Sequence, residues 1–150
     1  MTGLDRYEVF LEKLQKEIDQ IGDDEILIIY TDIKHFKYIN DTYGYKVGDA
    51  LLKEFVSEFT HNNNMLVGAS RVYSDNFVTA SRICESGYTH EEFRELIHQL
   101  NKKWEAKFRE KYLNSRLQLC TGISIVNKDS RSFEAETVVS NANLARKVAK

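Results

Sequence analysis

The sequence predicts an α+β fold in which helices flank a central, mostly antiparallel sheet. Segments whose apolar residues recur every three or four positions, as in amphipathic helices, alternate with short β-rich runs. Two of these β-rich runs are separated only by residues of turn character, which favours a hairpin. The resulting order is α-β-α-β-β-α-β-α, and two helices packed on one face of the sheet would bury the helical stripes economically.

The first half begins with an amphipathic helix, whose apolar stripe is Tyr7, Phe10, Leu11, Leu14, Ile18 and Ile21. Residues 25–32 are largely apolar and β-branched and end at Asp32, which predicts a central strand covered on both faces. A short helical turn from Phe36 to Asn40 should follow, and then a loop bearing Gly44 and Gly48. The next helix carries its apolar side chains on one side, at Leu51, Leu52, Phe55, Val56 and Phe59.

The second half begins with the predicted hairpin, whose strands are residues 65–72 and 77–83. Thr89 and Glu92 have the spacing of a capping box, and the helix that they open continues through Phe93, Leu96, Ile97, Leu100, Trp104 and Phe108. Alternating apolar residues from Leu117 to Ile125 predict a further strand. A last helix should run from about Ala135 to the end, with its inward positions at Val138, Ala142, Ala145 and Ala149.

Length and composition are those of one ordinary globular domain. The chain has 150 residues, of which 42% are hydrophobic and 29% charged, and it has no proline or linker-like tract, so we expect one domain over 1–150. With a net charge of −2, the chain as a whole has no electrostatic attraction to nucleic acid or to a membrane surface. Cys84 and Cys120 suggest neither a disulfide framework nor a metal motif, and no apolar run could span a bilayer. We expect a cytoplasmic location. This expectation also covers a domain that is the cytosolic part of a membrane-anchored protein.

The densest polar cluster, residues 31–49, carries a specific resemblance to a known family. The GGDEF family pattern "DxDxFKxIND.YGH..GD" is matched in register at Asp32, Phe36, Lys37, Ile39, Asn40, Asp41, Tyr43, Gly44, Gly48 and Asp49. The chain also resembles the family's opening "LTGL" at residues 2–4, its late strand at 121–125, and its closing "AD.AL..AK" at Asn143, Ala145, Ala149 and Lys150. The chain is thus similar to a GGDEF domain, the diguanylate cyclase family, over its whole length. The resemblance implies the palm-like fold of nucleotide cyclases.

The resemblance implies a magnesium site and a GTP site in this chain. The Asp32 carboxylate and the carbonyl of Ile33 would bind Mg²⁺ together with Asp75, since hard cations take oxygen ligands. Asp75 would also be the residual catalytic residue, which we expect to be insufficient on its own. The alternative for Asp32 is an ordinary strand-end aspartate that caps the next turn.

Guanine and phosphate recognition would come from neighbouring positions. Asn40 and Asp49 resemble the family's guanine-binding residues. A carboxylate can accept hydrogen bonds from both N1–H and N2–H₂ of guanine, a pattern that adenine lacks. Their alternative roles are a turn-forming Asn and a helix N-cap Asp. Phe36 and Lys37 open a helical turn whose N–H groups can hold phosphate. Lys150 resembles the family's late phosphate lysine, and for each lysine a solvated surface charge is the alternative.

The family's namesake motif is degenerate here, with Tyr73-Ser74-Asp75-Asn76-Phe77 in place of Gly-Gly-Asp-Glu-Phe. The two glycines that would let backbone approach a phosphate are lost. Asn76 replaces a glutamate and Lys34 replaces the second Asp of "DxD", changes of one and two charge units that make the site three units more positive. We therefore expect weakened Mg²⁺ binding and retained phosphate attraction, with Lys34 in part replacing a metal. The product-inhibition motif RxxD is also absent at residues 64–67.

These features predict a degenerate GGDEF domain that binds GTP as a regulatory module without efficient diguanylate cyclase activity. Two alternatives stay open, a weakly active cyclase that converts two GTP to cyclic di-GMP and a ligand-free protein-interaction module. The chain begins and ends at the usual motif edges of the domain. We therefore expect it to be excised from a longer protein, beside a sensor or an EAL-type phosphodiesterase domain. A homodimer is a further expectation, since cyclase chemistry needs two facing domains.

Overall fold

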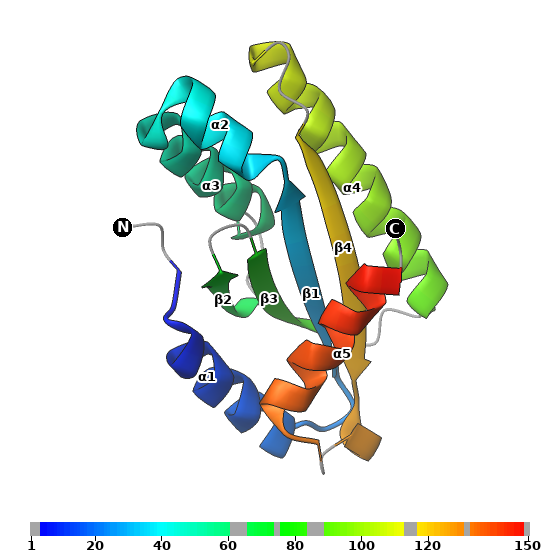
Figure 1. The fold of residues 1–150 in the computed structure, drawn as a ribbon. Helices are drawn as coiled ribbons and strands as arrows, with labels where there is room; N and C mark the ends of the chain where they lie inside the picture. The colour runs from blue at the N-terminus through cyan, green and yellow to red at the C-terminus, as the bar shows by residue number, and fades with distance from the viewer. Residues whose placement is uncertain are drawn as a thin grey trace.

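The computed structural model describes residues 4–60, 66–73, 76–83, 89–112, 117–130 and 133–148. The elements follow the expected order (Figure 1) and are α1 (Tyr7–Asp19), β1 (Glu25–Lys34), α2 (Phe36–Tyr43), α3 (Tyr45–Thr60), β2 (Leu66–Tyr73), β3 (Asn76–Ile83), α4 (His90–Lys111), β4 (Gln118–Val126), the 3₁₀ turn η1 (Lys128–Ser130) and α5 (Ala135–Val148). None of the helices in these ranges is long and apolar enough to cross a membrane.

Within the described residues, the sheet has four strands in the order β2-β3-β1-β4, and every neighbouring pair is antiparallel. β1 is an interior strand, and its residues from Ile26 to Ile33 are all buried, which confirms the prediction of a strand covered on both faces. It continues two residues past Asp32, to Lys34. The predicted hairpin is formed by β2 and β3, in which Tyr73 is paired with Asn76.

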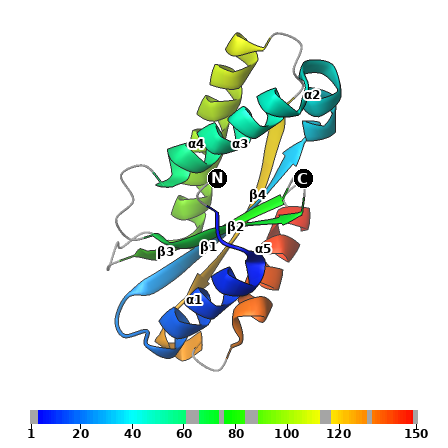
Figure 2. The ribbon, with the colours of Figure 1, turned by 90° about the vertical axis from the view of Figure 1, so that its left-hand side faces the viewer.

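Helices cover both faces of the sheet, and Figure 2 shows α1 and α5 on one side and α3 and α4 on the other. Ile26, Ile28 and Tyr30 of β1 lie in the core with α1 and α5. Leu27 and Ile29 lie on the other face, where they pack with α4. The expectation of two helices on one face fits α1 and α5, but it was incomplete, because an apolar strand with both faces buried needs helices on both.

Two predicted helix ends can be compared in detail. The capping box at α4 is confirmed, because Thr89 Oγ1 accepts from the Glu92 N–H at 3.1 Å and the Glu92 carboxylate accepts from the Thr89 N–H at 3.3 Å. The predicted loop bearing Gly44 and Gly48 is shorter than expected. Gly44 ends α2 with a φ of 90°, so α3 begins at once and Gly48 lies in its first turn.

The helix α5 lies directly on β4 at Gly122. A Cβ atom on Gly122 would overlap the backbone of α5 at Ala142 and Arg146, so only glycine permits this approach. Val138 and Ala142 are buried as predicted, whereas Ala145 is half-buried and Ala149 lies outside the described residues. The close approach places the C-terminal part of α5 beside the end of β1.

Candidate functional site

The end of β1 presents two charged side chains on the face covered by α5. Because alternate residues of a strand point to the same face, Asp32 and Lys34 follow Tyr30 on this side. Ile33 points to the opposite side, into the core formed with α3 and α4. Asp32 is only 7% exposed. A carboxylate at this depth is costly unless it is paired.

Two cations pair with the Asp32 carboxylate, and both contact its Oδ2 atom. Lys34 Nζ lies 3.0 Å from it, and the NH1 atom of Arg146, on α5, lies 3.1 Å from it. Asn143 accepts a 2.9 Å hydrogen bond from Arg146 Nε, and the guanidinium carbon lies 5.7 Å from the centre of the Tyr30 ring. These contacts hold Arg146 over the end of β1, where it neutralises a buried carboxylate.

Of the predicted magnesium ligands, Asp32 is described and its carboxylate is already paired with two cations. Mg²⁺ needs several oxygen ligands in near-octahedral geometry, and the Oδ2 atom of Asp32 is already in contact with two cations. Within the described ranges, no three His, Cys, Asp or Glu side chains form a group that could hold a metal. Ile33 lies in β1 opposite Leu119, and Asp75 lies outside the described residues. The set of metal ligands stays a prediction.

Asn76 lies directly opposite Asp32 on the neighbouring strand β3. Directly opposed residues of antiparallel strands leave the sheet on the same face, so the Asn76 side chain faces the same side as the carboxylate. Its Oδ1 atom is buried and has no hydrogen-bond partner within the described part of the chain. The position that holds a glutamate in the family pattern thus carries an unsatisfied neutral acceptor beside the ion cluster.

The predicted phosphate-binding turn is the N-terminus of α2. His35 precedes it in the left-handed conformation, with a φ of 68°, and turns the chain sharply from β1 into the helix. The His35 side chain makes no capping hydrogen bond, and the first turn of α2 carries no acidic residue. Phe36 is buried in the core, while Lys37 beside it is exposed. The turn therefore offers backbone N–H groups and one accessible ammonium group to an anion.

The predicted guanine readers lie at the junction of α2 and α3. The side chain of Asn40 packs against Gly48, and a Cβ atom on Gly48 would overlap its Oδ1 atom. Asp49 follows Gly48 inside α3, so its alternative role as an N-cap is wrong; its side chain lies outside the description. The structure therefore brings Asn40 to the first turn of the helix that carries Asp49.

Other sequence-predicted positions lie outside the described residues. Asp75 and Lys150 are among them, and so is the side chain of Tyr73, whose backbone ends β2. Their roles stay predictions.

The sequence reasoning missed Arg146. The buried positions of α5 are Ala135, Val138, Val139 and Ala142, and the next helical step of four reaches Arg146. In the quoted pattern "AD.AL..AK" this position holds a leucine. A charged residue that continues an apolar stripe is a signal that a buried partner exists, but the sequence does not say which carboxylate that partner is.

The comparison with known sequences identifies one family. The family model described as diguanylate cyclase, GGDEF domain, matches residues 1–150. Among curated proteins, the chain is similar to the "Uncharacterized protein y4lL" of Sinorhizobium fredii, with 28% identity over the whole chain and 18% of that protein. It is also similar to the "Biofilm architecture maintenance protein MbaA" of Vibrio cholerae, with 36% identity over 59 residues, which are 35% of the chain and 8% of that protein. The chain thus spans a small part of these relatives.

Solved structures share the fold. A sensory box/GGDEF family protein from Caulobacter crescentus has a TM-score of 0.72 and 24% identity, with 98% of this chain and 93% of that chain covered. The active GGEEF domain of a diguanylate cyclase from Vibrio cholerae has a TM-score of 0.67 and 18% identity, with coverages of 98% and 90%. Together with the family match over all 150 residues, these similarities show that the chain belongs to the GGDEF domain family of cyclic di-GMP signalling.

Proposed function

We propose that this GGDEF domain binds GTP as a regulatory module and lacks efficient diguanylate cyclase activity. The packing of Asn40 against Gly48 is the observation that carries the proposal. It holds the Asn40 amide, on α2, against the first turn of α3, because any larger residue at position 48 would displace the amide.

The N-terminus of α2 supports the phosphate part of the proposal. Its uncapped first turn and the exposed ammonium group of Lys37 both favour a bound anion. Lys34 is half-buried at the end of β1, the strand that precedes α2, and it adds a second cation.

Differences from the family pattern at the end of β1 and at the start of β3 argue against turnover. Phosphoryl transfer in this family uses carboxylates that concentrate and aim metal ions. Here the carboxylate of Asp32 is paired with Lys34 and Arg146, and the residue opposite it is the neutral Asn76. We therefore infer that binding persists while cyclic di-GMP synthesis is lost.

A thermal-shift and product assay tests the proposed function. At a nucleotide concentration a hundred times Kd, GTP should raise Tm by about 5 °C or more, and ATP should not. No cyclic di-GMP should form from GTP in Mg²⁺, as measured by chromatography. Product that accumulates catalytically would favour the weakly active cyclase instead, and a chain that responds to no guanine nucleotide would contradict the proposal.

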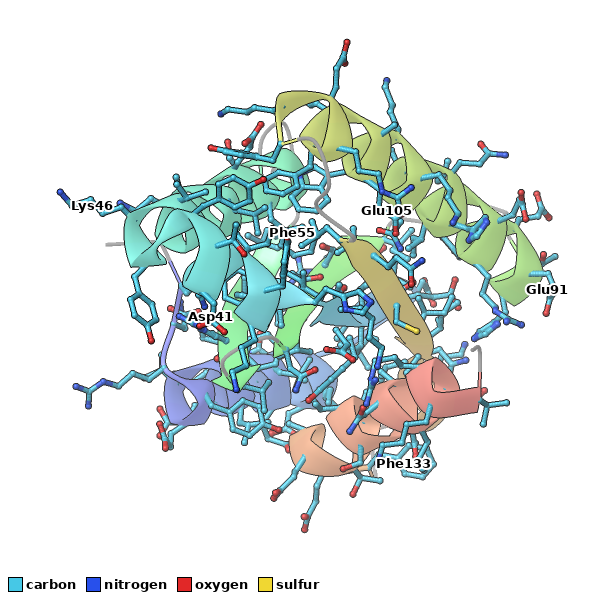
Figure 3. The ribbon with its side chains drawn as sticks, turned by 45° about the horizontal axis from the view of Figure 1, so that its top comes forward. Asp41, Lys46, Phe55, Glu91, Glu105 and Phe133 are labelled. Carbon is cyan, nitrogen blue, oxygen red and sulfur yellow. The ribbon has the colours of Figure 1, made fainter. Side chains whose placement is uncertain are left out.

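Matched variants separate the two parts of the GTP site. Asn40→Ala should abolish the preference for GTP over ATP, whereas Thr42→Ala, at an exposed position of the same helix, should keep it. Lys37→Ala should weaken binding of GTP more than that of guanosine. Lys46→Ala is its control, since this lysine points from α3 into solvent (Figure 3).

The groove beside β4 favours a second candidate function, that of an interaction module. β4 is an edge strand, and a groove of about 690 Å³ runs along it between α4 and α5. Leu144, on its wall, is 58% exposed. In a longer protein, a neighbouring sensor or EAL-type phosphodiesterase domain could dock on such a surface, or a second copy in a homodimer. Stable association with such a domain in the absence of nucleotide would favour this function.

A further inference from the structure

The Asp32 carboxylate receives cations from two separate elements. Lys34 comes from the same strand, two residues later, and Arg146 comes from α5. Both contact the same oxygen, Oδ2, at 3.0 and 3.1 Å. A divalent cation at this oxygen would have to displace at least one of them and would be repelled by the other.

Arg146 is not free to leave this position at low cost. Its side chain is only 11% exposed, and its Nε atom donates to Asn143 while its guanidinium lies over the Tyr30 ring. Moving the guanidinium away would break these contacts and would leave the buried carboxylate with one partner fewer. Lys34 differs, because its side chain is 40% exposed and its ammonium can reach a ligand from solvent.

The charge of the cluster matches that of a metal site. One carboxylate and two cations leave a net charge of +1, and a Mg²⁺ ion on a single carboxylate would leave the same charge. The electrostatic attraction for a phosphate group is therefore retained without a metal. The negative charge near Asp32 is also lower than in the family pattern, because Asn76 faces the same side of the sheet as Asp32 and is neutral.

We propose that Arg146 and Lys34 take the place of the divalent cation at Asp32, so that nucleotide phosphates bind here without a metal ion. Arg146 is the positioning residue, which holds the carboxylate, and the positive charges of Arg146 and Lys34 together weaken metal binding at Asp32. Lys34 is the cation that contacts the phosphate. The phosphate part rests on the proposed GTP binding, whereas the exclusion of metal from Asp32 does not.

Titration with Mn²⁺, monitored by the electron paramagnetic resonance of the free ion, tests the exclusion of metal. The wild-type chain should bind Mn²⁺ at least about tenfold more weakly than the double variant Arg146→Leu with Lys34→Asp, which frees Asp32 and adds a carboxylate. Lys147→Leu, at an exposed position beside Arg146, should behave as wild type. Wild-type Mn²⁺ binding that Asp32→Asn abolishes would overturn the proposal.

Folding of the double variant is checked by circular dichroism, and Lys34→Asp alone serves if the double variant does not fold. Lys34→Asp removes only the more exposed cation, so Mn²⁺ should bind it more tightly than wild type and should raise its Tm. A Lys34→Asp variant that gains no affinity for Mn²⁺ would contradict the proposal. Arg146→Lys keeps the cation and should continue to exclude Mn²⁺.

GTP titration by calorimetry tests the phosphate part. For wild type and for Arg146→Lys, the affinity for GTP in EDTA should stay within about threefold of the affinity in Mg²⁺. Lys34→Ala should weaken the affinity for GTP by about tenfold under both conditions. A collapse of wild-type affinity in EDTA would overturn the metal-free binding. Absence of GTP binding under either condition would contradict the proposed function, and the Mn²⁺ titration would still decide whether Asp32 is closed to metal.

Discussion

NH1 of Arg146 lies 3.1 Å from Oδ2 of Asp32 and joins the end of α5 to the end of β1 across 114 residues of sequence. Both side chains are 11% exposed, so the pair is shielded from water to a degree that a surface pair is not. Glu91 and Arg94 make an ordinary surface pair on α4, at 3.2 Å, with side chains that are 80% and 50% exposed.

A double-mutant cycle should separate these two pairs. With Asp32→Asn and Arg146→Met, the coupling free energy of unfolding should be about 1–3 kcal/mol, because removal of either partner leaves a poorly solvated charge. The same cycle with Glu91→Gln and Arg94→Met should give about 0.5 kcal/mol or less. Urea denaturation measures both. Equal couplings would mean that burial gives the Asp32–Arg146 pair no advantage over a surface pair.

Gly48→Ala should affect ligand recognition more than stability. The new Cβ would overlap Asn40 Oδ1, which is the end of a side chain that can rotate away, and alanine favours the helix by about 1 kcal/mol. The free energy of unfolding should therefore change by less than about 1 kcal/mol, while the preference for GTP over ATP is lost. Denaturation together with nucleotide titration checks both. A variant that keeps its preference would show that the Asn40 amide has no part in guanine recognition.

Gly122→Ala should have the opposite pattern, with a large loss of stability. Here the added Cβ would overlap backbone atoms of α5, which can move only if the whole helix shifts from the sheet. We expect a destabilisation of about 2–3 kcal/mol, in the range of overpacked cores. Gly22→Ala is the control, since a Cβ there would meet nothing within 4 Å. Similar urea midpoints for the two variants would contradict this account of the α5 packing.

Glu105→Ala should destabilise the edge of the sheet. Glu105 points from α4 toward β4 (Figure 3), is 3% exposed, and accepts a 2.6 Å hydrogen bond from the Leu119 N–H. Loss of the acceptor leaves a partly buried N–H group without this partner, which costs about 1–3 kcal/mol. Glu105→Gln keeps an acceptor and should recover part of this loss. Hydrogen exchange at the Leu119 amide should rise in the alanine variant, and an unchanged rate would contradict the role.

Local patterns were sufficient for most of the fold. Apolar periodicity predicted the order of helices and strands, and the turn residues predicted the hairpin of β2 and β3, because these signals arise between residues close in sequence. The pattern of α4 was less complete. Leu96 and Leu100 continue its apolar spacing yet are exposed, whereas the polar Asn101 and Glu105 are buried against β4. Which side of a long helix meets the sheet depends on its crossing direction.

The sequence by itself indicated the family, and it predicted the position of the GGDEF-like motif and the loss of two acidic groups, since each of these can be seen in a contiguous run of residues. Only the tertiary structure decided what the remaining carboxylate contacts. The pairing of Asp32 with Arg146 depends on the alternation of β1, which turns the carboxylate toward α5. It also depends on Gly122, which lets α5 lie close to the sheet. Contacts between segments 114 residues apart follow from how the elements pack, and no local pattern specifies them.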